Sequence, residues 1–325
     1  MRDELGRAAT VLGSAPEVVL ACHVNPDADA LGSMLGLAAH LEARGTRTVC
    51  SFPNEPLDPP RWAGLLPGAD RLVAAADVPP APAVMVTCDC ASFDRLGRLG
   101  AAATQAGELI WIDHHRSNDG VGTIRLVDPD ASSTCEVVAR LIDAIGGELT
   151  TASATCLYAG LITDTGRFQY EATTPETLRL AARLRELPFD HTRLAQALFD
   201  DADPAALDVL GIALGRLEHV RDAGLVWTYL LQGDLRGLAP GETDDLIDII
   251  RASRDADVAA VLKQQRDGRF KVSVRSRGAH DLAAIAAAFG GGGHRLAAGY
   301  TSERGPAGTI EDLVAALAGR APARA

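Results

Sequence analysis

Short apolar runs of four to seven residues alternate with longer stretches of helical spacing through the first half of the chain. The apolar runs predict strands at 18–22, 46–52, 84–88 and 109–112, and the helical spacing predicts helices at 30–44, 132–145, 152–165 and 175–187. Strands that alternate with helices are typical of βαβ units, in which the strands form a parallel sheet. We therefore expect an α/β fold with a parallel sheet in this half.

The pattern restarts after a polar and acidic stretch that Pro188 and Pro204 bound. Beyond it, the spacing predicts helices at 205–220, 244–253, 281–289 and 310–317, and strands at 225–231, 258–264 and 270–277. We therefore expect a first domain at 1–190, a linker with a connecting helix at 191–220, and a smaller second α/β domain at 221–325.

The composition sets limits on the class of protein. The 325 residues are 47% hydrophobic and 23% charged, which allows a sizeable core and excludes disorder over most of the length. No apolar run approaches the ~20 residues that span a bilayer, and the first residues form no apolar signal core. We therefore expect a cytoplasmic protein with no membrane partner. The six cysteines include no C-x-x-C pair, and we expect them to be free and buried.

The net charge of −12 bears on nucleic-acid binding. Proteins that hold long duplex by its phosphates usually present a basic face, so the charge argues against long duplex DNA as a partner. A small nucleotide or a short strand held in one local basic pocket stays open. Some of the acidic residues are also candidates for metal ligands, whose charge a bound cation would offset.

Residues of metal-ligand type follow three of the predicted strands. The first strand runs into His23, Asp27 and Asp29, the third ends at Asp89, and the fourth ends in Asp113, His114 and His115. Because ligands bind outside the carboxyl ends of the strands in parallel α/β sheets, we expect these side chains to meet at one edge. Asp164 is a further candidate, since it lies near the end of an apolar helix, where a cation would offset an expensive buried charge.

Each of these residues has an ordinary alternative role when it is taken alone. A lone aspartate after a strand is usually a turn residue or a helix cap, and Asp27 or Asp29 could cap the helix that begins at residue 30. The combination favours a metal site, and mixed imidazole and carboxylate donors suit Mn²⁺, Zn²⁺, Fe²⁺ or Co²⁺ better than Mg²⁺. Five aspartates and three histidines are too many donors for one ion, and two ions are the usual device for phosphoester hydrolysis.

Basic residues and glycines mark a second candidate site in the C-terminal part. On the strand at 270–277, Arg275 and Arg277 share one face, which predicts a phosphate grip, with a solvated strand edge as the alternative. The glycine run before His294 lets backbone N–H groups approach an anion, with a flexible turn as the alternative. The predicted substrate contacts are Arg275, Ser276, Arg277, Gly291, Gly292, Gly293 and His294. Phe168 and Tyr170 could stack on a base, but we favour core packing for both.

The sequence resembles the DHH phosphoesterase family. The matching residues are His23-x3-Asp27-x-Asp29-Ala-x-Gly32-Ser33, Asp89 after a strand, Asp113-His114-His115 and Gly160-x3-Asp164-Thr-Gly166. The segment Phe289-Gly-Gly-Gly-Gly293-His294-x3-Ala298-Gly299 is similar to the DHHA1 substrate domain of that family. The length and the pairing of domains are most similar to the NrnA-like subgroup, which contains nanoRNases, phosphatases of 3′-phosphoadenosine 5′-phosphate (pAp) and cyclic-dinucleotide phosphodiesterases.

The resemblance implies a fold and a division of roles. The fold would be an N-terminal parallel-sheet DHH domain and a smaller α/β DHHA1 domain, with the active site in the cleft between them. His23, Asp27 and Asp89 would hold one Mn²⁺, and Asp29, Asp89, His114 and Asp164 a second, with Asp89 bridging and with Mg²⁺ or Co²⁺ as substitutes. His115 would contact the scissile phosphate as an acid or electrostatic stabiliser, and Asp113 would orient a histidine. A homodimer is also implied.

The expected function is Mn²⁺-dependent hydrolysis of short oligoribonucleotides (nanoRNA, and linear dinucleotides such as pApA), of pAp and of cyclic di-AMP. Two alternatives stay open. An inorganic pyrophosphatase of the DHH type shares the first domain but lacks the Gly-Gly-Gly-His segment, and it would release inorganic phosphate from pyrophosphate. A non-catalytic nucleotide-binding or RNA-binding protein would be marked by a lost ligand, and no motif residue is missing.

Overall fold

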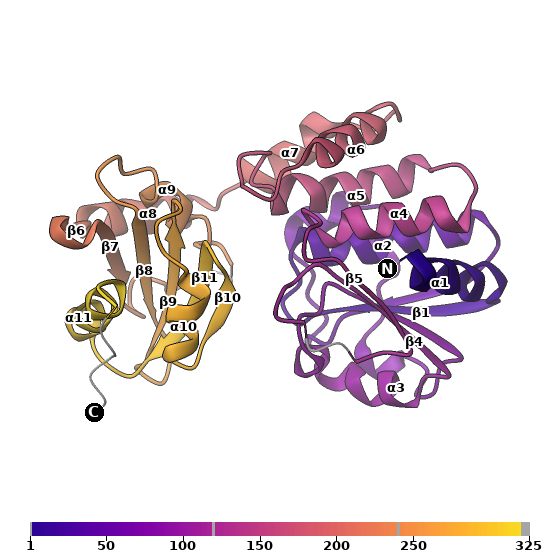
Figure 1. The fold of residues 1–325 in the computed structure, drawn as a ribbon, viewed down its shortest axis with the longest axis horizontal. Coiled ribbons are helices and arrows are strands. Elements are labelled where there is room, and N and C mark those ends of the chain that lie inside the picture. Colours follow the sequence, from indigo (N-terminus) through magenta and orange to yellow (C-terminus); the bar gives the residue numbers. More distant parts are fainter. Residues whose placement is uncertain (1, 119–120, 239–240, 320–325) are drawn as a thin grey trace. The chain divides into compact units, whose positions relative to one another are not determined.

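The computed structural model describes residues 2–118, 121–238 and 241–319. The chain divides into two compact units, Met1–Asp201 and Ala202–Ala325 (Figure 1). Each unit has its own sheet and its own hydrophobic core. The predicted α/β fold, with a parallel sheet in the first part and a second, smaller α/β part, is confirmed.

The sheet of the first unit is parallel throughout. Its strands are β1 Glu17–Cys22, β2 Arg47–Ser51, β3 Val84–Cys88, β4 Glu108–Asp113 and β5 Ile124–Val127, in the spatial order β2-β1-β3-β4-β5. The strand β5 escapes the sequence-based prediction because it is a four-residue edge strand in which exposed Arg125 separates buried Ile124 from buried Leu126. So short a run gives little periodicity to detect.

Helices cover both faces of this sheet. They are α1 Arg2–Ser14, α2 Ala28–Ala43, α3 Gly100–Gln105, α4 Thr134–Ile145, α5 Thr151–Asp164, α6 Pro175–Arg185 and α7 His191–Phe199. Figure 1 shows α2, α4 and α5 on one face and α3 on the other. The alternating residues of β1 divide accordingly, with Leu20 in the core under α2 and Val19 in the core under α3. The helices α1 and α7 escape the prediction because each buries very few side chains.

The helices α2 and α5 pack closely against each other. A Cβ atom at Gly32 would overlap the carbonyl oxygen of Cys156, and one at Gly36 would lie 2.9 Å from Cδ2 of Leu157. Since only glycine lacks this atom, these two positions allow the backbones to approach. The result is a tight helix pair that carries candidate ligands at the start of α2 and at the end of α5.

The second unit contains a mixed sheet. Its strands are β6 Glu218–Val220, β7 Leu225–Leu230, β8 Val258–Gln264, β9 Phe270–Ser276, β10 Gly292–His294 and β11 Ala297–Ser302, in the order β10-β11-β9-β8-β7-β6. The strands β7 and β8 are parallel and the other neighbours are antiparallel. The strands β6, β10 and β11 were not predicted from the sequence. The strand β10 and the first half of β11 consist mainly of glycine and alanine, which lack the β-branched and aromatic pattern of strands.

The helices of the second unit follow the prediction with altered ends. They are α8 Pro204–Gly215, α9 Leu246–Ile250, α10 Leu282–Ala288 and α11 Pro306–Leu317. Short 3₁₀ helices are η1 Arg61–Leu65, η2 Ala69–Arg71, η3 Ala75–Asp77 and η4 Phe93–Leu99 in the first unit, and η5 Arg221–Ala223 in the second. The helix predicted at 205–220 ends at Gly215, because the chain then turns into β6.

All six cysteines are free and buried, as predicted. Burial raises the pKa of the thiols of Cys22, Cys88 and Cys135, which keeps these side chains protonated. Along the described part of the chain, no helix combines the length and the apolar character needed to cross a bilayer.

Candidate metal centre

Residues of metal-ligand type gather where three neighbouring strands end. Cys22 of β1 pairs with Cys88 of β3, and Cys88 pairs with Ile112 of β4, so the strands stop level with one another. In the described part of the first unit, three groups have ligand atoms within 4.8 Å of one another: His23 with Asp27 and Asp89, Asp29 with Asp89 and His114, and Asp89 with Asp113 and His115. Asp89 is common to these groups and therefore lies at the centre of the cluster.

Asp89 directly follows β3 and has an uncommon backbone conformation. Its φ of +60° lies in the left-handed region, which aspartate tolerates better than most residues and which is often found at functional sites. Its backbone N–H donates to the carbonyl of Ile112 at 2.9 Å, which ties the turn to β4. Its carboxylate oxygens lie 3.4 Å from Nε2 of His23 and 3.8 Å from Nε2 of His114. A buried carboxylate between two imidazoles is suited to bridging two cations.

Asp27 and Asp29 stand at the start of α2. Asp27 is the helix cap, since its Oδ1 accepts the backbone N–H of Ala30 at 2.9 Å, while its Oδ2 lies 3.7 Å from Nε2 of His23. The capping role and a ligand role are therefore compatible. Asp29 is buried, and its two oxygens accept the backbone N–H groups of Thr134 and Cys135, at 2.6 and 2.9 Å, at the N-terminus of α4.

Gly160 lets α5 reach this corner of the unit. A Cβ atom there would lie 2.7 Å from both Cα and Oδ1 of Asp29, and it would overlap Sγ of Cys135. One helical turn later, Oδ2 of Asp164 lies 3.1 Å from Nε2 of His114. The absence of a side chain at position 160 therefore allows the end of α5 to place Asp164 in the cluster.

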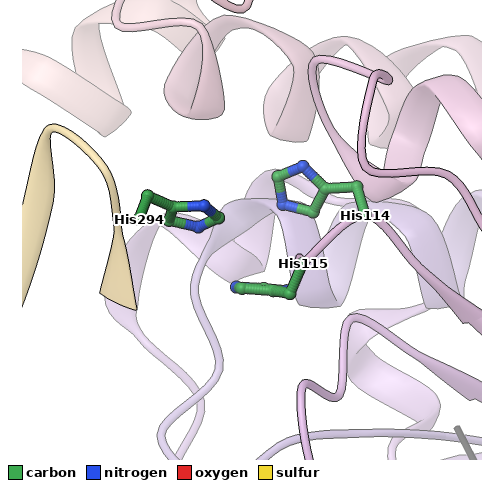
Figure 2. Close-up of side chains that lie close together, drawn as sticks. All are labelled: His114, His115 and His294. Carbon is green, nitrogen blue, oxygen red and sulfur yellow. The ribbon is translucent and has the colours of Figure 1, made fainter. Parts of the chain in front are cut away.

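His114 and His115 follow β4, as Figure 2 shows, and they have different partners. Their ring centroids are 4.7 Å apart, with an angle of 64° between the planes. Nδ1 of His115 lies 2.7 Å from Oδ1 of Asp113, and the same oxygen accepts the backbone N–H of His114 at 2.8 Å. The other oxygen of Asp113 accepts a hydrogen bond from Nδ2 of Asn118 at 2.5 Å. Asp113 is therefore placed to orient the ring of His115, and Asn118 supports Asp113.

Negative charge is concentrated around these imidazole rings. Burial and the neighbouring carboxylate of Asp89 raise the pKa of Asp29 to about 7. Burial and the charges of Asp29 and Asp89 raise the pKa of Asp164 well above its usual value. Burial by itself lowers the pKa of His23, but Asp27 and Asp89 outweigh it and raise this pKa to about 10. Buried carboxylates that repel one another beside imidazole nitrogens fit divalent cations, whose charge would offset the repulsion.

A pair of asparagines, which the sequence analysis did not single out, fixes the loop between His23 and Asp27. Asn25 has a φ of +52°, which asparagine tolerates. Its backbone N–H donates to Oδ1 of Asn54, and Nδ2 of Asn54 donates to Oδ1 of Asn25, both at 2.7 Å. The dipeptide Asn25-Pro26 signals a turn in the sequence, but the partner lies 29 residues away and no spacing rule identifies it.

Burial alternates along β9, which separates the candidate substrate contacts. Phe270, Val272 and Val274 are buried, and Arg275 lies on the opposite face, half-buried. Ser276 is buried on the core side, where its hydroxyl donates to Oδ2 of Asp257 at 2.8 Å. Arg277 is exposed and donates to the carbonyl of Ser253 at 3.0 Å. The structure thus places Arg275 and Ser276 on different faces of the strand.

The glycine run continues from α10 into β10, which pairs with β11. A Cβ atom at Gly291 would lie 2.6 Å from Cβ of Tyr300, and one at Gly293 would lie 2.6 Å from Cα of Ala298. Gly292 has open space at this position. His294, which Figure 2 shows on β10, is exposed. Close approach to β11 therefore accounts for the glycines at 291 and 293, whereas a Cβ atom at 292 would meet no neighbouring atom of the unit.

Two aromatic residues beyond Asp164 pack within the first unit. Phe168 is partly buried against the hydrophobic core, which confirms the preference for core packing over stacking on a base. The ring of Tyr170 lies against Gly166, where a Cβ atom would overlap it. Both residues therefore help to hold the turn after α5.

Comparisons with known proteins identify the family of the chain. The model of the DHH family, N-terminal domain, matches residues 17–161, and the model of the DHHA1 domain matches residues 228–321. The chain belongs to the DHH family. The resemblance that the motifs indicate is thereby confirmed, and the DHH model spans the strands that carry His23, Asp89 and Asp113.

Relatives of the DHH family cover most of the chain. The bifunctional oligoribonuclease and PAP phosphatase NrnA of Thermus thermophilus is 35% identical over 284 residues, which are 87% of this chain and 83% of the relative. The protein of the same description from Bacillus subtilis is 27% identical over 306 residues, 92% of each chain.

Solved structures of DHH-family proteins share the fold. The crystal structure of an exopolyphosphatase-related protein from Bacteroides fragilis has a TM-score of 0.89 at 23% identity, over 98% of this chain and 96% of that one. RecJ from Thermus thermophilus in complex with Mn²⁺ has a TM-score of 0.57 at 18% identity, over 98% of this chain and 54% of that one.

Proposed function

We propose that this chain cleaves short oligoribonucleotides and removes a phosphate from pAp. It is a hydrolase of phosphoester bonds, as its membership of the DHH family and the activities of its NrnA relatives indicate. The substrate proposal is supported by the relatives, which are described as oligoribonucleases and PAP phosphatases and which the chain covers over 83% and 92% of their lengths. The observation that carries the proposal is the largely buried cluster of carboxylates and imidazoles around Asp89.

Divalent cations fit this cluster, and we propose two Mn²⁺ ions. His23, Asp27 and Asp89 would hold one, and Asp29, Asp89, His114 and Asp164 the other. Mixed nitrogen and oxygen donors suit Mn²⁺ or Co²⁺, and Mg²⁺ would be a weaker substitute. RecJ, which shares the fold, is solved in complex with Mn²⁺ and in complex with Mg²⁺, which supports the use of a divalent metal. Such ions, when bound, polarise a phosphate oxygen and lower the pKa of water.

His115 is the side chain that we assign to the scissile phosphate. Its Nδ1 lies 2.7 Å from Oδ1 of Asp113, so the proton on Nδ1 faces that carboxylate, and Nε2 would donate to a phosphate oxygen when the ring is protonated. A carboxylate on Nδ1 fixes both the tautomer and the orientation of the ring. Asn118 holds Asp113 in turn, so the direction of the ring is set before a substrate arrives.

We propose that the second unit binds the part of the substrate that lies away from the metals. Arg275, Arg277 and His294 would contact phosphate, and the backbone at Gly291–Gly293 would approach it closely. Ser276, which bonds Asp257, would fix the end of β9 rather than touch the ligand. A short substrate suits a chain with a net charge of −12, because a few local cations suffice to bind it. The homodimer stays a prediction.

Product analysis with Mn²⁺ tests the proposal. We expect mononucleotides from pApA and AMP from pAp. Phosphate release from pyrophosphate alone would instead identify a pyrophosphatase, and tight nucleotide binding without turnover would identify a binding protein. Either result would contradict the proposal. An additional reaction with cyclic di-AMP determines whether the substrate range includes the cyclic dinucleotide.

Arg275→Ala and His294→Ala are expected to weaken the cleavage of short substrates. Loss of one charge-assisted contact costs about 1.5–3 kcal/mol, or ~10–150-fold in kcat/KM. KM should rise if the lost contact is equally strong in the ground state and in the transition state. If the contact also aligns the phosphate for reaction, kcat should fall. Steady-state kinetics on oligonucleotides of two to about twelve residues measure this effect.

Lys271→Ala is the matched control, because Lys271 is an exposed cation on the same face of β9. Metal content should be unchanged in all three variants. The account of the second unit is wrong if both test variants cleave dinucleotides like the parent, or if the parent prefers the longest strands. Gly292→Ala adds an independent check: its methyl group has open space within the unit, so a fall in activity would point to the ligand.

A further inference from the structure

Thr134 contacts two candidate metal ligands that come from different elements. Its hydroxyl Oγ1 donates to Oδ1 of Asp89 at 2.8 Å, and its backbone N–H donates to Oδ2 of Asp29 at 2.6 Å. Asp89 follows β3, Asp29 lies in α2, and Thr134 is the first residue of α4. One residue therefore sets the positions of two carboxylates that the sequence separates by 60 residues.

The hydroxyl of Thr134 has no role in capping α4. The N-cap is Ser133, whose side chain accepts the backbone N–H of Glu136 at 3.1 Å. A threonine inside a helix usually turns its hydroxyl to a carbonyl of its own helix or to water. Thr134 is fully buried and turns it to a carboxylate of another element. The hydroxyl at position 134 therefore serves Asp89, and α4 does not need it for capping.

The segment that carries Thr134 is held by a second buried network. Oε2 of Glu136 accepts the backbone N–H of Ser132 at 3.2 Å, the hydroxyl of Ser132 at 2.6 Å and the hydroxyl of Thr177 at 3.0 Å. The other oxygen of Glu136 pairs with Arg140. Since Thr177 belongs to α6, the start of α4 is anchored to a neighbouring helix as well as to its own next turn. These contacts therefore fix the backbone position of Thr134.

We propose that Thr134 is a positioning residue of the metal centre, a role that rests on the proposed function of the cluster. The hydroxyl bonds one lone pair of Asp89 and restrains the rotamer of this carboxylate, so the other lone pairs of Asp89 would be available to cations. The backbone N–H groups of Thr134 and Cys135 do the same for Asp29. These donors also stabilise two buried carboxylates in the charged form that metal binding requires.

The substitution Thr134→Val isolates the hydroxyl. Valine has nearly the same shape and keeps the backbone N–H that Asp29 accepts, so only the bond to Asp89 is lost. Loss of a hydrogen-bonded support of a ligand typically weakens metal binding by ~10–100-fold. We expect a rise of that size in the Kd for Mn²⁺, measured from the electron paramagnetic resonance signal of unbound Mn²⁺. Thr134→Ser, which keeps the hydroxyl, should bind Mn²⁺ nearly like the parent.

Thr155→Val is the matched control. Thr155 is a buried threonine in α5 of the same unit, and its hydroxyl donates to the carbonyl of Thr151 at 2.8 Å rather than to a carboxylate. It should lose stability without losing Mn²⁺ affinity. If Thr134→Val melts too early for the measurement, Thr134→Ala against Thr134→Ser makes the same comparison. The inference is overturned if the variant without the hydroxyl binds Mn²⁺ like the parent, or if the serine variant binds it as weakly.

The Mn²⁺ measurement needs no turnover and therefore separates this inference from the proposed function. A parent protein that binds Mn²⁺ but cleaves none of the substrates would refute the function and leave the role of Thr134 intact. A parent that cleaves them, together with a valine variant of unchanged Mn²⁺ affinity, would refute only the role of Thr134. A parent that binds no Mn²⁺ would refute both.

Discussion

Replacing Asp89 with alanine is expected to lower kcat by at least ~10³, the scale seen when one member of a cooperating catalytic group is removed. Asp89 shares a potential metal site with His23 and Asp27 on one side and with Asp29 and His114 on the other. Its loss would therefore affect both ions. The variant should also bind less Mn²⁺, which equilibrium dialysis with metal analysis would show.

Two further variants make the result specific. Asp89→Asn keeps the shape of the side chain and tolerates the φ of +60°, so a comparable loss would show that the charge matters and not the backbone. Asp77→Ala removes an exposed carboxylate of η3 and should leave kcat unchanged. Retention of two tightly bound ions and a near-normal rate in the Asp89 variants would refute the bridging assignment.

Removal of divalent metal should abolish turnover completely, and Mn²⁺ should restore it. Bound ions would polarise the phosphate and lower the pKa of water. They would also offset the burial and mutual repulsion of carboxylates, which raise the pKa of Asp29 to about 7 and that of Asp164 well above its usual value. A cation that binds only the folded chain stabilises it by about 2.7 kcal/mol at a hundredfold excess over Kd. The melting temperature of the chelated protein should therefore rise on addition of Mn²⁺.

Measurement of activity and of melting temperature on the same samples makes this test decisive. Asp89→Ala serves as the control, because most of the Mn²⁺-induced rise in melting temperature should be lost in it. Full activity after exhaustive chelation, with metal content verified by elemental analysis, would exclude the metal-dependent mechanism altogether.

The sequence contains enough information to locate most of the ligand cluster. His23, Asp89 and Asp113 directly follow or end strands, and parallel strands bring such residues to one edge whatever the details of packing. Periodicity is equally reliable along β9, where the alternation that turns Arg275 away from the core also places Ser276 with the buried residues. At the strand ends and along β9, the pattern of apolar residues therefore suffices to predict where these side chains lie.

The supporting residues could not be predicted in this way. Thr134 donates a hydrogen bond to Asp89, which is 45 residues away, and Asn25 donates one to Asn54, which is 29 residues away. Neither distance corresponds to a helical or strand period, so the pairings arise only from the packing of whole elements. The strand β10 was missed for a related reason, because pairing with β11 and not β-propensity makes Gly292 and Gly293 part of the sheet.

The contact at Gly160 has a consequence for how this chain can change over evolutionary time. Any side chain there would meet Asp29 and Cys135 at once, so three helices depend on one position that carries no atoms beyond the backbone. A larger residue at 160 would become tolerable only with a smaller one at 135 and a displaced α2. Displacement of α2 would carry Asp29 away from its donors on α4. Substitutions at position 160 therefore have to occur together with changes at 135 and in α2. Single substitutions should be tolerated mainly on the outer surfaces of the same helices.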